Sequence, residues 1–378
     1  MKFLLLCLCV AVANAGLAPL ITSNSRTVPD SWIIKVKDVK QIARIEKEIK
    51  DILEVMRAGV PTVETYEQVL PGLALKIPAC ALNVVRGIES IEYIHEDQIG
   101  AIYGSQSGAT WGIDRIDSRT GTNGVFNYND NALGQGANIF IVDTGIRTTH
   151  IAFGGRASTI YGANVDDHGH GTHCAGTAGG DVYGIARKAN VYSVKVCNSW
   201  GSCPLSTVQA GLNAIVNQFG TGNGKGVVSM ALGFSKNSQM DAMVNDMLNK
   251  GYTVSVVAGN DNSNACNVSP ANVPGALTTA ASTSSDSRSY ASNYGSCVDL
   301  FAPGYNIVSA SYSSDTGSLT MSGSSMACAH VTGACAVYLG SNPGSSPSTV
   351  HSAIVNAATN GVISDAQGSP NKLLYVAP

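Results

Sequence analysis

Four runs of apolar residues between residues 138 and 258 constrain the fold of this chain more than any other feature. The apolar runs cover 138–143, 191–196, 227–232 and 253–258. One helical pattern, 205–219, lies between the second and third runs, and another, 239–250, lies between the third and fourth. Unbroken apolar runs are typical of strands that are buried on both faces, as in parallel sheets. Strand–helix alternation therefore predicts a three-layer α/β domain whose mainly parallel sheet is covered by helices. Two further helices are expected at 324–340 and 347–358.

The ends of these strands are where functional side chains are expected. In open parallel sheets, reactive groups gather at the carboxyl edge. Asp143 ends the first apolar run, and Asn260 lies just beyond the last one. We therefore expect both side chains at the same edge of the sheet.

The composition changes near residue 104, which indicates two domains. Residues 31–98 are rich in Lys, Glu, Ile and Val, whereas the later sequence is rich in Gly, Ser, Asn and Ala. The early region predicts strand 31–37, helix 39–56, strands 62–66 and 73–77, helix 79–87 and strand 91–94. This β-α-β-β-α-β order is that of a small ferredoxin-like α+β domain.

The first fifteen residues have the pattern of a secretory signal peptide. Lys2 precedes an apolar run over 3–12, and Ala13-Asn14-Ala15 is a small-x-small cleavage site. This pattern predicts cleavage after Ala15 and an extracellular location. No later segment reaches the roughly 18 uninterrupted apolar residues of a membrane-spanning helix.

Charge and composition exclude several functions. The formal net charge is −3 and charged residues make up 13% of the chain, with no basic stripe. Nucleic acids and anionic membranes are therefore not expected as partners. A hydrophobic content of 44% argues against a disordered chain.

Three short segments supply the parts of a nucleophilic catalyst. Residues 141–145 carry a carboxylate, 170–176 an imidazole and 323–327 a serine hydroxyl. A serine needs an adjacent base to take its proton, and the base needs a carboxylate to hold its tautomer. The order Asp, His, Ser differs from that of chymotrypsin-like enzymes and α/β-hydrolases. No Gly-x-Ser-x-Gly motif surrounds a serine, which argues against a lipase-like esterase.

Together these segments resemble the subtilisin family, and their surroundings look most like its proteinase K and aqualysin branch. The resemblance implies a serine endopeptidase with Ser325 as nucleophile, His170 as base and Asp143 as the carboxylate that orients the base. It also implies that Asn260, in Ala-Gly-Asn at 258–260, binds the oxyanion of the tetrahedral intermediate. No cofactor is implied for catalysis.

The histidines near the second segment allow a second interpretation. His168, His170 and His173 lie close together with two aspartates, as metal ligands can do. Glycines separate them, and no single helical face carries all three. Since the first His of His-Gly-Thr-His matches the family's base, we expect His170 to be the base. His173 is expected to pack in the helix, and His168 to face solvent in a loop.

The third segment departs from the family pattern Gly-Thr-Ser-x-Ala-x-Pro at two positions. Ser324 stands for the threonine, which keeps a hydroxyl as an oxyanion contact, and Ala329 stands for the proline. Without the proline the helix is expected to be straighter, and Ser325 to shift by a fraction of an ångström. These departures leave open a catalytically impaired subtilisin-like binding protein as the alternative.

The resemblance also implies where a substrate binds. The family holds its substrate as an added strand between two segments, which here match Gly201-Ser202-Cys203 and Ala231-Leu232-Gly233. The primary pocket would be walled by the latter segment and by Val257-Ala258-Gly259. Main-chain pairing predicts broad specificity, and uncharged walls predict apolar or aromatic residues before the cut.

The early domain resembles the family's inhibitory pro-domain, which is also an intramolecular chaperone. The resemblance implies a signal peptide at 1–15, a pro-domain at 16–103 and a peptidase domain at 104–378 that acts as a monomer. Alignment by Trp111-Gly112 places self-cleavage after Tyr103, at the end of the peptide 100–103.

Ten cysteines are present, of which Cys7, Cys9 and Cys80 would leave during processing. The seven that remain leave at least one thiol unpaired. Cys266 and Cys297 match a disulfide of the aqualysin-like enzymes, and Cys197 and Cys203, which flank a short loop, are a second expected pair. Cys174 resembles the free thiol of the proteinase K branch, and Cys328 and Cys335 are unassigned.

A structural calcium ion is the last implication of the resemblance. Asp299 matches its carboxylate ligand, and the backbone carbonyls of Pro274 and Ala276 match its other protein ligands. Such oxygen donors suit Ca²⁺. Asp114 and Asp117 match part of a second site. Asn267 lies in a glycosylation sequon followed by Pro270, which disfavours its use.

Overall fold

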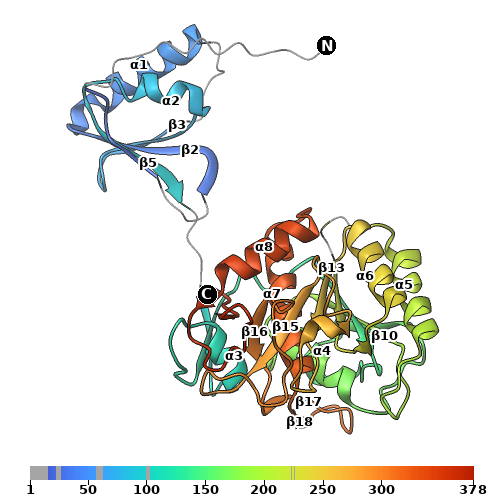
Figure 1. Cartoon of the computed structure of the whole chain (residues 1–378). Helices are drawn as coiled ribbons and strands as arrows, with labels where there is room; N and C mark the ends of the chain where they lie inside the picture. The colour runs from blue at the N-terminus through green and yellow to red at the C-terminus, as the bar shows by residue number, and fades with distance from the viewer. Residues whose placement is uncertain (1–15, 23–26, 57–62, 99–102, 223, 225) are drawn as a thin grey trace. The chain divides into compact units, whose positions relative to one another are not determined.

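The computed structural model describes residues 16–22, 27–56, 63–98, 103–222, 224 and 226–378. It divides into two compact units, Met1–Ala101 and Ile102–Pro378, which are described separately (Figure 1). The expected signal peptide at 1–15 and all but the last residue of the peptide 100–103 lie outside the described residues.

The first unit is a five-stranded sheet of order β1-β5-β2-β4-β3 with two helices. Its elements are β1 (Leu20–Ile21), β2 (Thr27–Val36), η1 (Val39–Gln41), α1 (Ile42–Val55), β3 (Val63–Tyr66), β4 (Gly72–Lys76), α2 (Ala79–Val85) and β5 (Ile91–Gln98). On α1, Ile42, Ile45 and Ile49 recur at helical spacing and pack into one core with the sheet. The segments follow the expected β-α-β-β-α-β order, with β1 and the 3₁₀ turn η1 in addition.

The second unit is built on a nine-stranded sheet of order β19-β20-β16-β15-β13-β11-β8-β10-β9. Its strands are β8 (Asn138–Asp143), β9 (Ala157–Tyr161), β10 (Asn190–Lys195), β11 (Gly226–Met230), β13 (Thr253–Val257), β15 (Leu277–Ser282), β16 (Leu300–Pro303), β19 (Thr359–Asn360) and β20 (Lys372–Leu373). All neighbours pair in parallel except β19 and β20. The carboxyl ends of β8, β10, β11 and β13 therefore meet at one edge.

Helices cover both faces of this sheet, which confirms the expected three-layer α/β fold (Figure 1). Ile139 and Ile141 of β8 join a core with α4 (His170–Gly179), α7 (Ser324–Ser341) and α8 (Pro347–Ala357). Phe140 and Val142, which point to the opposite face, join a core with α5 (Leu205–Phe219) and α6 (Ser238–Asn249). Because alternate side chains of β8 point to opposite faces of the sheet and its central side chains are all apolar, this strand contributes to both cores.

Smaller elements complete the unit. Three two-stranded sheets pair β6 (Tyr103–Ser107) with β7 (Val125–Asn129), β12 (Phe234–Ser235) with β14 (Val268–Ser269), and β17 (Ile307–Ala310) with β18 (Ser318–Met321). The short helices are α3 (Trp111–Ile116), η2 (Ile151–Phe153) and η3 (Ala265–Asn267). Among the helices of the described residues, none combines the length and apolar character needed to cross a bilayer.

Both expected disulfides are present in the second unit, Cys197–Cys203 and Cys266–Cys297. The thiols of Cys174, Cys328 and Cys335 are buried. Burial raises the pKa of the Cys328 thiol to about 12, so it stays protonated at neutral pH.

Candidate active site

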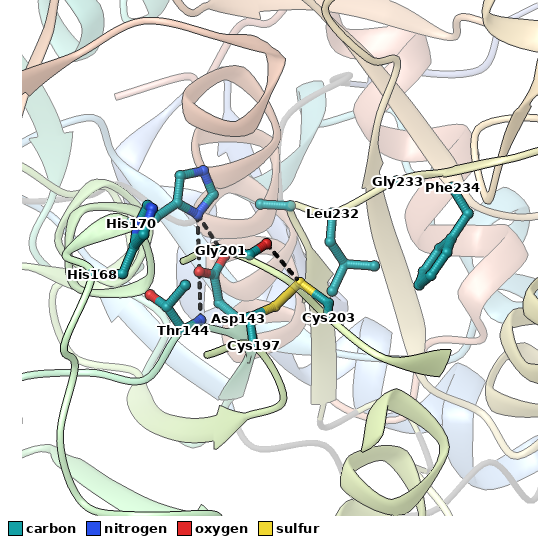
Figure 2. Close-up of a pocket in the computed structure, with 11 residues that line it drawn as sticks. Asp143, Thr144, His168, His170, Cys197, Gly201, Cys203, Leu232, Gly233 and Phe234 are labelled. Atoms are coloured by element: carbon teal, nitrogen blue, oxygen red, sulfur yellow. Dashed lines mark hydrogen bonds and ion pairs between the residues drawn. A yellow bond between two sulfur atoms is a disulfide. The ribbon is translucent and has the colours of Figure 1, made fainter. Parts of the chain in front are cut away.

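An ion-pairing carboxylate and imidazole lie at the carboxyl edge of the sheet. Asp143 is the last residue of β8, and His170 is the first residue of α4. The His170 Nδ1 atom lies 2.9 Å from each carboxylate oxygen of Asp143 (Figure 2). Asp143 is only 2% exposed, and one of its oxygens also accepts the backbone N–H of Thr144 at 2.6 Å. The carboxylate therefore has little freedom to move away from the imidazole.

Glycine allows α4 to start this close to β8. A Cβ atom at Gly171 would lie 2.2 Å from the carbonyl oxygen of Gly145 and 3.1 Å from the Cβ of Asp143. Any side chain at this position would push the helix, and His170 with it, away from the strand end. The glycines of these segments are thus required by the close approach of two backbones.

Asp166 organises the same helix start and was not assigned a role from the sequence. Its Oδ1 atom accepts the N–H groups of His168 and Gly169 and the hydroxyl of Thr144. Its Oδ2 atom accepts the N–H and the hydroxyl of Thr172. The N-cap residue itself is Gly169, which has no side chain, so the usual N-cap signal directly before the helix is absent. Asp166 supplies the cap from three residues further upstream.

Two opposing effects act on the imidazole of His170. Burial lowers its pKa, because the charged form loses hydration. The adjacent Asp143 carboxylate raises the pKa and outweighs the burial. The pKa of His170 therefore lies well above its usual 6.5.

Ser325 is the second residue of α7 and is 8% exposed. Its hydroxyl lies 3.4 Å from the carbonyl oxygen of Ala231 and is not hydrogen-bonded to His170 in this side-chain orientation. Hydrogen bonds of unliganded active sites are often long or unformed. Rotation about the Cα–Cβ bond moves the hydroxyl without any backbone change.

Asn260 is exposed, and its orientation follows from one hydrogen bond. Its Oδ1 atom accepts the backbone N–H of Ser324 at 2.8 Å, so the NH₂ group of the amide is directed elsewhere as a donor. The Ser324 side chain is buried, and its hydroxyl accepts the N–H of Gly259 at 3.2 Å. As an acceptor, the hydroxyl of Ser324 therefore holds the 259–260 turn against α7, and its own O–H remains a donor.

A cavity of about 370 Å³ opens beside the Asp143–His170 pair (Figure 2). Its lining is Asp143, Thr144, His168, His170, Cys197, Gly201, Cys203, Ala231, Leu232, Gly233 and Phe234. Both expected substrate segments thus meet at one cavity. Phe234 belongs to the lining although no sequence signal pointed to it.

Four of the expected substrate-binding residues are absent from this lining. The N–H and the carbonyl of Ser202 are both bonded to Asn198, inside their own loop. Val257 and Ala258 are buried, and Gly259 is half-buried. The cavity is therefore bounded by the 201–203 and 231–234 segments, without the wall expected from 257–259.

The structure separates the three histidines. His173 is buried, and its Nε2 atom lies 2.9 Å from the carbonyl oxygen of Ile307, as expected of a packed helix residue. Burial lowers the pKa of His173 to about 4. The expectation that His168 faces solvent is wrong: it is half-buried and lines the cavity. Among the described residues, the three imidazoles do not gather into a metal-ligand cluster.

The residues expected to bind calcium lie away from this cavity. Asp299 accepts the N–H of Thr278 through Oδ2 at 2.8 Å, and its Oδ1 atom lies 3.2 Å from the His351 Nε2 atom. Pro274 and His351 line a separate hollow of about 300 Å³, and the side chain of Ala276 is buried.

Asp114 and Asp117, the aspartates that match part of a second calcium site, both accept hydrogen bonds from a nearby turn. Both carboxylate oxygens of the buried Asp114 accept backbone N–H groups, from Asn123 and Gly124. Asp117 accepts both N–H groups of Asn127 through one oxygen, and burial raises its pKa. Both carboxylates thus hold the 123–127 turn, and the two hydrogen bonds of Asp117 leave its other carboxylate oxygen outside this network.

Comparison with known proteins identifies the family to which this fold belongs. The subtilase family, Peptidase_S8, matches residues 134–373. The chain is 43% identical over 325 residues to the extracellular serine proteinase of Thermus sp. (strain Rt41A), covering 84% of this chain and 78% of that protein. It is 35% identical over 364 residues to proteinase R of Parengyodontium album, covering 95% of this chain and 92% of that protein.

A solved structure agrees with these relatives. The crystal structure of a cold adapted subtilisin-like serine proteinase superposes with a TM-score of 0.68 at 41% identity, covering 72% of this chain and all of that one. The chain therefore belongs to the subtilase family of serine endopeptidases. Enzymes of this class hydrolyse protein substrates and need no cofactor for catalysis.

Proposed function

We propose that this chain is a secreted, self-activating serine endopeptidase of broad specificity, with Asp143, His170, Ser325 and Asn260 as its catalytic residues. The observation that carries the proposal is the Asp143–His170 contact of 2.9 Å at the wall of a substrate-sized cavity. Ser325, at the start of α7, lies against Ala231 of the same cavity lining.

The geometry supports the following sequence of steps. The Ser325 hydroxyl turns from Ala231 toward His170, which takes its proton as Ser325 attacks a peptide carbonyl. The oxyanion receives hydrogen bonds from the Asn260 NH₂ group and from the N–H of Ser325, which lies in the first turn of α7, where backbone N–H groups lack helical partners. His170, paired with Asp143, then protonates the leaving amine, and water repeats the steps on the acyl-enzyme.

The cavity lining supports a preference for apolar or aromatic residues before the cut. Apart from the Asp143–His170 pair and His168, its side chains are uncharged, and Leu232 and Phe234 are apolar. A pocket for Lys or Arg would need a carboxylate of its own. Pairing through the main chain of the substrate adds affinity without sequence selection, which supports broad specificity.

The same proposal covers maturation. Residues 1–15 would direct secretion, 16–103 would act as intramolecular chaperone and inhibitor, and cleavage after Tyr103 would release a monomeric enzyme, 104–378. The relative named extracellular serine proteinase supports secretion, as do two disulfides, which persist in oxidising compartments. N-terminal sequencing of the mature protein tests this: a first residue several positions from Gly104 contradicts the junction.

We also propose a structural Ca²⁺ at Asp299, with the carbonyls of Pro274 and Ala276. The donor set fits, because Thr278 holds only one oxygen of Asp299 and the other faces His351 across a gap without hydrogen-bond alignment. Chelation should lower the melting temperature of the wild type but not that of Asp299→Asn. If chelator changed the melting temperatures of the two proteins equally, the proposed calcium site at Asp299 would be wrong.

A fluorophosphonate probe tests the catalytic assignment directly. It should form a covalent bond to Ser325 in the mature wild type, and mass spectrometry should locate it there. Ser325→Ala should not be labelled. A mature wild-type protein that stays unlabelled would favour the catalytically impaired alternative, and labelling at another serine would refute the assignment of the nucleophile.

A further inference from the structure

The loop between β10 and α5 is closed upon itself by the Cys197–Cys203 disulfide. Its first residue is tied to the catalytic edge, because the N–H of Cys197 donates to the carbonyl oxygen of Asp143 at 3.1 Å. Both cysteines and Gly201 line the cavity. The loop is therefore part of the cavity wall and is rooted at the strand end that carries the carboxylate.

Asn198 fixes the interior of this loop. Its N–H donates to the carbonyl of Ser202, and its own carbonyl accepts the N–H of Gly201, both at 3.0 Å. Its side-chain oxygen accepts the N–H groups of Trp200 and Ser202, again at 3.0 Å. Gly201 has a φ of 73°, which a glycine adopts without strain. Four hydrogen bonds and a disulfide thus hold a loop of only a few residues.

This rigid loop carries Trp200 at its tip, with 87% of the residue exposed. No other large hydrophobic residue of the described chain is more exposed. The indole adds nothing to the core, yet its backbone is held by the Asn198 side chain and its neighbour Gly201 lines the cavity. Tryptophan is enriched among the residues that contribute most to binding at interfaces, because it presents a large apolar surface together with a polar N–H group.

We propose that Trp200 is a substrate-binding residue at the rim of the cavity, where it packs against an apolar or aromatic side chain of the bound polypeptide. The disulfide-closed loop 197–203 holds the backbone that carries the indole before the substrate arrives, so that little backbone conformational entropy is lost on binding. We assign the substrate as the partner of Trp200 because the loop that carries Trp200 is continuous with the cavity wall through Gly201 and Cys203. The inference rests on the proposed peptidase function and adds a specificity determinant to it.

A scanning peptide set tests the proposal. Blocked octapeptides with one fixed cleavage site carry Phe or Ser at each position in turn, and kcat and KM are measured for the wild type, Trp200→Ala and Trp200→Phe. In the wild type, Phe should be preferred about tenfold at one position besides the residue before the cut. Trp200→Ala should remove this preference through KM, and Trp200→Phe should restore most of it.

A matched control separates Trp200 from exposed aromatic residues in general. Tyr290 is 77% exposed and is not part of the cavity lining, so Tyr290→Ala should keep the wild-type preference. Identical peptide profiles for the wild type and Trp200→Ala would overturn the inference while leaving the peptidase intact. A wild type that cleaves no peptide and takes no fluorophosphonate would overturn the proposed function itself, and the inference with it.

The role of the disulfide is tested by a double-mutant cycle. Cys197→Ala/Cys203→Ala should weaken the Phe preference about threefold, because the freed loop must be ordered on binding. Adding Trp200→Ala to this variant should then reduce the Phe preference by a smaller factor than it does when the disulfide is present. Fully additive effects would show that the disulfide does not position Trp200.

Discussion

The two ends of the active site are held in different ways. At the α4 end, the carboxylate of Asp143 is bonded to His170 and to Thr144, and Asp166 gathers the helix start with five hydrogen bonds. At the α7 end, the Ser325 hydroxyl has one contact of 3.4 Å, to the carbonyl of Ala231. The proposed proton acceptor is thus held in place in advance, whereas the proposed nucleophile needs a side-chain rotation to reach it. Pre-organisation is concentrated where a charge must be stabilised.

Asp143→Asn should have the largest effect, because it removes the partner that holds the imidazole in its useful tautomer. We expect kcat to fall by about 10⁴-fold, the size of loss seen for such a change in another serine protease. A neutral imidazole is required to accept a proton, so kcat/KM of the wild type should rise with pH through the raised pKa of His170. The acid limb of the residual activity should therefore move to lower pH in the variant.

The pH profile of kcat/KM measures this shift. Asp246→Asn, which alters an exposed carboxylate paired with Lys250 on α6, should leave both the rate and the profile unchanged. If Asp143→Asn kept the wild-type acid limb, the pair would not be what sets the pKa of His170.

Asn260→Ala should have the next largest effect on kcat. In subtilisin, loss of an oxyanion-binding asparagine costs about 10²–10³ in kcat, and we expect a loss of that class here. KM should change little, since the amide acts on charge that develops only in the transition state. Asn213→Ala, an exposed change on α5, is the control. An effect on KM alone would contradict the assignment.

Ser324→Ala should have the smallest effect of the three. It leaves the half-buried N–H of Gly259 without its acceptor, at a cost of about 1 kcal/mol in the free energy of unfolding. A loosened 259–260 turn should also lower kcat by about three- to tenfold, because Asn260 is no longer held in register. Ser324→Thr keeps the hydroxyl and should restore both quantities, which denaturant unfolding and steady-state kinetics would show. A Ser324→Ala protein as stable and active as the wild type would show that the α7 end is even looser than described.

The comparison of the two ends also shows what could be read from the sequence. The bounds of β8 and α5 were predicted to the residue, since an apolar run and an amphipathic pattern each carry a strong local signal. Strands β15 and β16 were missed. β15 is made largely of Thr, Ala and Ser, and β16 has only four residues and ends in Pro; α7 packs on both strands. Their strand character depends on tertiary contacts that local pattern does not reveal.

The same division holds within the site. Motifs pointed to Asp143 and His170, which the structure brings into contact. The roles of His168 and Asp166 were missed. His168 lines a cavity whose other walls come from distant segments, and Asp166 bonds to the distant Thr144 as well as to its own helix start. Ser324 was expected to keep a hydroxyl as an oxyanion contact. The motif does not reveal that this hydroxyl accepts the N–H of Gly259, which lies on a distant segment.

The closed loop at 197–203 has a consequence for engineering. Its ends are joined by their own disulfide, its turn is held by Asn198, and its tip residues Ser199 and Trp200 are exposed. Those two positions are therefore an exchangeable cassette: side chains can be varied there without touching the sheet, the helices or the Asp143–His170 pair. With Trp200 as the proposed substrate-binding residue, a library confined to residues 199 and 200 should change the substrate preference while leaving the proposed catalytic residues unaltered.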